Sequence, residues 1–162
     1  MASKSLSVTV RQTINADQRV AFEVIAPIDL RKVFPGYAFF PAVVDVRNYP
    51  GHWDKAGLSR MPVFTDGSTA HETLIDYDSP RTFSYEVTGF TNIFGHIVSK
   101  ARGEWLFSTI HTGVTHIDWT YEFYPRKAMR PFLKCITPFW RRYMQKSLRL
   151  ACQQVIGYRK PR

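Results

Sequence analysis

Apolar and polar residues alternate over most of the chain, which is the pattern of strands with one buried face. Leu6, Val8 and Val10 alternate with polar residues near the start. Weaker strand signals follow at 43–46 and 63–64, and clear ones at 69–77, 83–88, 96–111 and 113–125. Asp66-Gly67 and Thr112-Gly113 are typical hairpin turns. The pattern therefore predicts a sheet of neighbouring antiparallel strands.

Helical signals are confined to two short segments and the tail. Asp17 and Asp29 are suitable N-caps for short helices over 18–25 and 30–34. Pro131 suits the first turn of another short helix, and Thr137-Pro138 predicts the N-cap and first residue of a long one ending near Tyr158. Its apolar face recurs at spacings of three and four residues: Trp140, Met144, Leu148, Ala151, Val155 and Tyr158.

These elements predict a single α+β domain spanning residues 1–162. A curved antiparallel sheet would wrap around the long C-terminal helix, with two short helices after the first strand. One helix covers a concave sheet only in part, so we expect a cavity between them, and such cavities bind apolar molecules.

Composition agrees with an ordinary globular chain, 44% hydrophobic and 15% aromatic. No apolar run reaches the roughly 18 residues that span a bilayer. The first residues lack the apolar core of a signal peptide, so the sequence indicates a cytoplasmic protein. Cys135 and Cys152 are then expected as reduced, buried thiols in the tail.

Net charge is +9, and it is unevenly distributed along the chain. The part ending at Glu122 holds 11 Lys and Arg against 13 Asp and Glu, whereas the remainder holds 11 Lys and Arg and no acid. Three interpretations are open: a solvated helix face, an anionic membrane surface, or nucleic acid. The membrane candidates are Arg141, Arg142, Lys146 and Arg149. Nucleic acid is the least favoured because no recognition motif is present.

Three segments resemble the START-like helix-grip superfamily. Residues 66–87, DGSTAHETLIDYDSPRTFSYEV, are similar to its strand, acidic-proline turn and strand, and 113–125, GVTHIDWTYEFYP, to its last strand. The tail resembles its closing helix. Trp53, Gly57 and Arg60 before Asp66-Gly67 resemble an uncharacterised bacterial branch of polyketide cyclase/dehydrase-like proteins. The resemblance implies the helix-grip fold, but it does not select among carriers, receptors and cyclases.

Candidate site residues come from parity and from the resemblance. In related ligand-binding proteins an acidic residue at the place of Glu72 faces the pocket, although local alternation also allows Glu72 to face solvent. His96 would lie near the cavity mouth, where it would contact a ligand or be a structural or solvent-exposed residue. Aromatic and apolar residues on inward parities either contact a ligand or fill the core: Tyr85, Trp105, Trp119, Tyr121, Trp140 and Met144.

Motifs for other chemistry are missing from the sequence. The five histidines form no metal-binding pattern, so no metal and no other cofactor is implied. No phosphate-binding loop or nucleophile elbow is present. We therefore expect a protein that binds an apolar or amphipathic small molecule such as a lipid, isoprenoid, polyketide or aromatic compound.

Two rival hypotheses remain. One is a cyclase, dehydrase or hydrolase with Glu72 or His96 as base and a tyrosine as donor. The other is a membrane-associated carrier that uses the basic helix. Nothing in the pattern specifies an oligomeric state.

Overall fold

The computed structural model describes residues 4–158. Its strands are β1 (Leu6–Ile14), β2 (Val43–Arg47), β3 (Ser59–Phe64), β4 (His71–Asp78), β5 (Thr82–Thr88), β6 (Val98–His111) and β7 (Val114–Pro125). Its helices are α1 (Gln18–Ile25), α2 (Leu30–Val33), α3 (Phe94–Ile97) and α4 (Arg130–Gly157).

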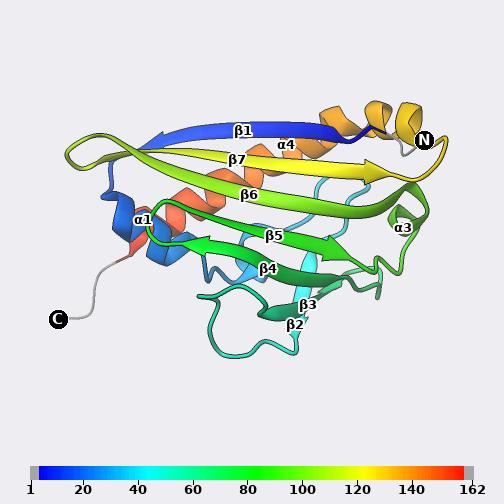
Figure 1. Cartoon of the computed structure of the whole chain (residues 1–162), viewed down its shortest axis with the longest axis horizontal. Helices are drawn as coiled ribbons and strands as arrows, with labels where there is room; N and C mark the ends of the chain where they lie inside the picture. Colours follow the sequence, from blue (N-terminus) through cyan, green and yellow to red (C-terminus); the bar gives the residue numbers. More distant parts are fainter. Residues whose placement is uncertain (1–3, 159–162) are drawn as a thin grey trace.

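One antiparallel sheet holds all seven strands in the order β1-β7-β6-β5-β4-β3-β2. The long helix α4 crosses one face of this sheet obliquely, and its C-terminal part lies beside α1 (Figure 1). Helix α4 packs chiefly against β1, α1 and α2. This arrangement confirms the predicted α+β helix-grip fold.

The short helices begin where the sequence predicts. The Asp17 carboxylate accepts a hydrogen bond from Arg19 N at 2.9 Å, and the Asp29 carboxylate accepts one from Arg31 N at 3.0 Å. Each bond satisfies a backbone donor that the first helical turn leaves unpaired.

The closing helix differs from the prediction, because α4 starts at Arg130 and runs through Pro138 without a break. Thr137 is therefore not an N-cap; its hydroxyl donates to Leu133 O at 2.7 Å inside the helix. Proline has no backbone N–H, so the carbonyl of Lys134 lacks the hydrogen bond that residue 138 would otherwise donate. Both residues are exposed, so this carbonyl lies on the side of the helix that faces solvent. The tail holds another difference: Cys152 is buried as expected, but Cys135 is exposed.

Aromatic rings fill the concave face of the sheet beneath the C-terminal half of α4. Trp105 and Trp119 stack with ring centroids 4.5 Å apart, and Phe83 stacks on Trp105 at 5.9 Å. Gly103 makes this packing possible, because the ring of Tyr85 occupies the space that a Cβ at position 103 would need. This half of the interior is therefore largely filled, and the larger open space lies elsewhere.

Candidate functional site: an apolar cavity under helix α4

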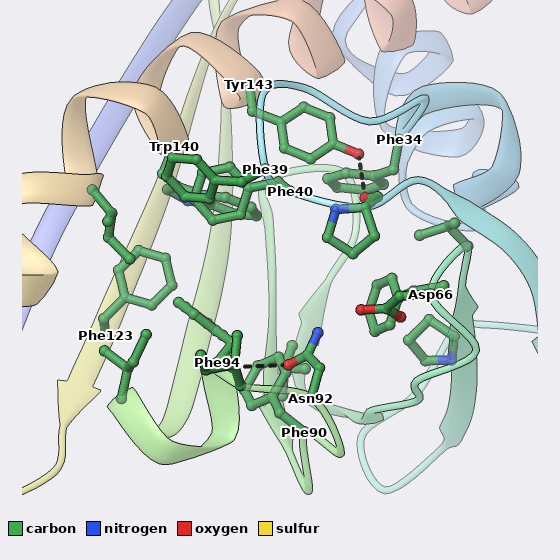
Figure 2. Close-up of a pocket in the computed structure, with 18 of the residues that line it drawn as sticks. Phe34, Phe39, Phe40, Asp66, Phe90, Asn92, Phe94, Phe123, Trp140 and Tyr143 are labelled. Carbon is green, nitrogen blue, oxygen red and sulfur yellow. Dashed lines mark hydrogen bonds between the residues drawn. The ribbon is translucent and has the colours of Figure 1, made fainter.

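A cavity of about 340 Å³ lies between the N-terminal half of α4 and the sheet. This volume falls at the lower end of the range for small-molecule sites, about 300–1,000 Å³. Side chains from α2, the loop after it, the strands, α3 and α4 surround the space (Figure 2). Most are apolar, including Phe34, Phe40, Val87, Phe90, Phe94, Ile97, Phe123, Ile136 and Trp140.

Tyr143 on α4 fixes the loop that forms one wall of the cavity. Its hydroxyl accepts a hydrogen bond from Gly36 N at 2.8 Å and donates to Pro41 O at 3.2 Å. Burial raises the pKa of Tyr143 to about 12, so the hydroxyl keeps its proton at neutral pH. Phe39 and Phe40 are thereby held against α4, where Phe40 packs on Trp140 at 5.0 Å.

Glu72 lies at the inner wall of the cavity and is buried. The sequence left its orientation open because Leu74 and Asp76 share its parity. A β-bulge between Leu74 and Asp76 resolves this ambiguity, since it shifts the phase of the strand. Glu72 and Leu74 are consequently buried, whereas Asp76 is exposed.

Arg60 neutralises Glu72 through a buried ion pair that sequence analysis missed. Arg60 and Glu72 are cross-strand partners on β3 and β4, with 2.9 Å between Nη2 and Oε1. Their side chains are only 5% and 6% exposed. The Arg60 guanidinium also lies 4.3 Å from the ring centroid of Trp53. One signal in the sequence pointed to Arg60, because Trp53, Gly57 and Arg60 form the short motif that resembles the bacterial branch of the superfamily.

A second void of about 30 Å³ lies behind Glu72, with room for about one water molecule. Tyr85 and Trp105 line this void and not the larger cavity, whereas Glu72 and Tyr121 line both. Trp119 Nε1 donates to the Tyr85 hydroxyl at 3.2 Å. Burial raises the pKa of both tyrosines, so both remain neutral hydroxyls.

Three other candidates from the sequence lie outside the lining of the larger cavity. Trp119 and Met144 are fully buried in the core, because the aromatic stack fills the space beneath that part of α4. His96 follows Gly95 on α3, where it is exposed and is not part of the cavity lining. Of the eight candidates, Glu72, Tyr121 and Trp140 line the larger cavity.

The polar groups of the lining are few. Trp140 Nε1 is buried and has no hydrogen-bond partner within residues 4–158. Asp66 and Asn92 lie at the cavity's opening; the Asn92 side chain accepts from Phe94 N at 3.1 Å. Neither residue was predicted, since Asp66 was interpreted only as part of a turn. Both are shown with the neighbouring phenylalanines in Figure 2.

An exposed apolar rim, formed by Phe39, Ile93, Phe132 and Phe139, surrounds the opening. The exposed fraction ranges from 39% for Phe139 to 78% for Ile93. Phe39, Ile93 and Phe132 also line the cavity, and Phe39 packs on Phe139 at 5.4 Å. Sequence analysis missed the rim, because most of its residues lie in loops or outside the predicted helix and have no periodicity.

The candidate membrane-surface residues of α4, Arg141, Arg142, Lys146 and Arg149, are all exposed. Arg141 Nη1 donates to Thr9 O at 2.9 Å at the edge of the sheet, on the β1 side. Lys146 Nζ lies 3.5 Å from Gly36 O, on the side of the cavity loop. Arg126, just before the helix, donates to Gly95 O at 2.6 Å beside the rim residue Ile93.

Residues 4–158 contain neither a metal-binding cluster nor a membrane-spanning helix. They hold no group of three or more His, Cys, Asp or Glu side chains that could bind a metal ion. Within the same residues, no helix is long and apolar enough to cross a membrane.

The fold is similar to that of several solved proteins with little sequence identity. Ara h 8.0201 has a TM-score of 0.70 and 15% identity, over 96% of this chain and 100% of that one. Norcoclaurine synthase from Thalictrum flavum has a TM-score of 0.71 and 11% identity, over 99% and 91%. The ZhuI aromatase/cyclase from Streptomyces sp. R1128 has a TM-score of 0.67 and 16% identity, over 94% of each chain. A search of curated protein sequences gives no significant match.

Sheet, gripping helix and apolar cavity together define a helix-grip, hydrophobic ligand-binding fold. The chain belongs to the family described as polyketide cyclase/dehydrase and lipid transport, whose model matches residues 5–153. This membership confirms the resemblance found in the sequence.

Proposed function

We propose that this protein binds one amphipathic small molecule with a mainly apolar body in the cavity under α4. The observation that carries the proposal is the cavity itself, about 340 Å³ with a lining of aromatic and aliphatic side chains. The Trp140 ring lines the cavity, but its Nε1 is not exposed there, so the polar contacts open to a ligand come from Asp66 and Asn92.

A cavity-filling variant tests the proposal. Ile136 lines the cavity from α4, so Ile136→Trp should reduce the affinity for the neutral apolar probe N-phenyl-1-naphthylamine by at least about tenfold. Ile156→Trp is the matched control, because Ile156 lies on the same helix, 67% exposed and outside the lining. Equal binding by both variants, or no binding by the unmodified protein, would refute a ligand site here.

The enzyme hypothesis has less support. Its two candidate bases are Glu72, which is paired with Arg60, and His96, which is exposed and outside the lining. A general base has to reach the proton that it removes within hydrogen-bond distance. We therefore favour binding over catalysis.

We further propose that the protein works at an anionic membrane surface, docked through the apolar rim. Exposed apolar patches of this kind mark interaction sites, and basic side chains add attraction to anionic lipids. Arg126 and Lys146 contact the two backbone segments that carry Ile93 and Phe39. Docking through this rim would place the cavity opening against the lipid.

Vesicle sedimentation tests the docking. The protein should sediment with phosphatidylglycerol vesicles and not with phosphatidylcholine vesicles, and added salt should weaken the binding. Phe39→Ser with Ile93→Ser should reduce binding, whereas Ile110→Ser should not. Ile110 is 56% exposed near the end of β6, opposite the end beside α3 (Figure 1). Equal loss with both sets of variants would exclude the rim as the docking surface.

A further inference from the structure

The cavity lining contains one charge that no other side chain neutralises. Its two carboxylates belong to Asp66 and Glu72, and no Lys, Arg or His of residues 4–158 is part of the lining. Arg60 neutralises Glu72 from behind. Asp66 has no Lys or Arg partner within the described part of the chain.

Local hydrogen bonds keep Asp66 ionised. Its Oδ1 accepts from Ser68 N at 2.9 Å and from the Ser68 hydroxyl. These bonds, with the Ser68 hydroxyl as the largest contribution and the Asn92 side chain as a further one, lower the pKa of Asp66. The opening of an apolar cavity therefore carries a fixed negative charge at neutral pH.

The orientation of the Asp66 side chain places this charge where a bound ligand would meet it. Its carboxylate points into the cavity toward Phe90 and Asn92 (Figure 2). An anionic head group at this point would be repelled, although solvent and salt weaken the repulsion because Asp66 is exposed. A protonated amine would instead form a charge-assisted hydrogen bond with the carboxylate.

We infer that the ligand is a cationic amphiphile: an apolar body under α4 and a protonated amine at Asp66. This inference rests on the proposed function and deepens it. It also opposes the simplest expectation from net charge, because a protein of +9 attracts anions at long range. The two expectations predict opposite ligand preferences.

Three ligands of equal chain length distinguish them: decylamine, decanol and decanoate, each displacing N-phenyl-1-naphthylamine at pH 7. We expect decylamine to bind at least about tenfold more tightly than decanoate. Asp66→Asn keeps the acceptor for Ser68 and removes the charge, so it should bring the two affinities within about twofold. Asp54→Asn is the matched control, since Asp54 is exposed and outside the lining.

The outcomes separate the inference from the proposed function. If decanol and decanoate bind and decylamine has no advantage, or if its advantage persists in Asp66→Asn, the inference is wrong while a ligand site remains. If the probe binds and none of the three ligands displaces it, the inference is likewise wrong; if the probe itself does not bind, the proposed function fails and the inference fails with it.

Discussion

Replacing Glu72 with glutamine preserves the shape of the side chain and removes the charge that Arg60 faces. The guanidinium, 5% exposed, would then be a buried cation without a counterion. Unit charges about 4 Å apart attract by roughly 4 kcal/mol at an effective dielectric constant near 20. Breaking a buried pair by removing one partner costs about 3–5 kcal/mol. We therefore expect Glu72→Gln to lower the free energy of unfolding by about 3–5 kcal/mol.

Urea unfolding followed by circular dichroism measures this loss, and an exposed ion pair provides the control. Arg11 and Asp118 have the same kind of contact, 2.8 Å between Nε and Oδ1, but their side chains are 65% and 29% exposed. Asp118→Asn should cost less than about 1 kcal/mol. If Glu72→Gln costs no more than Asp118→Asn, the buried pair does not stabilise the wall of the cavity as argued.

A double-mutant cycle then isolates the interaction. Arg60→Met alone leaves an uncompensated carboxylate, whereas Arg60→Met with Glu72→Gln removes both charges. The double variant should be more stable than the sum of the single losses predicts, with a coupling of about 2 kcal/mol or more. Additive losses would show that each residue acts through its own packing.

Three further predictions concern the core and the tail. Gly103→Ala should lower the free energy of unfolding by about 1–3 kcal/mol in urea, because the new Cβ would overlap the ring of Tyr85. Gly157→Ala is the control and should not destabilise the protein, since a Cβ there meets nothing within 4 Å. Burial raises the pKa of Tyr143 from about 10 to about 12, so the stability present below pH 10 should decline between pH 10 and 12, and Tyr143→Phe should remove that part of the slope. Iodoacetamide should label the exposed Cys135 in the native protein and Cys152 only after denaturation, because burial raises the pKa of Cys152 to about 12; fast native labelling of both would contradict the buried position.

Local signals in the sequence were sufficient for most of the fold. Alternation located the strands, and the aspartate caps located two helices, because both signals depend on neighbouring residues. The start of α4 was wrong because proline at a first helical position and proline inside a helix give similar local patterns, and only packing distinguishes them. Helix α3 was missed because four residues do not establish a helical period.

The candidate site depends on features that a local pattern does not contain. Glu72 shares the inward face with Leu74, and a bulge between Leu74 and Asp76 removes Asp76 from that face. Arg60 reaches Glu72 through strand register across 12 residues. Asp66 and the rim residues Phe39 and Ile93 lie in loops, and the sheet and α4 determine the positions of these loops. Sequence analysis therefore found part of the inner wall and missed the opening.

Leu30, Phe34, Glu72 and Tyr121 line both voids and form the wall that sets how deep a ligand can go. Smaller neutral residues in this wall would deepen the 340 Å³ cavity toward the 30 Å³ void behind it, provided that Arg60 were exchanged together with Glu72. The change would require few substitutions and would leave the caps, the sheet register and the opening untouched. Changes in the inner wall would thus alter the length of ligand that this cavity accepts without altering the charge at its opening.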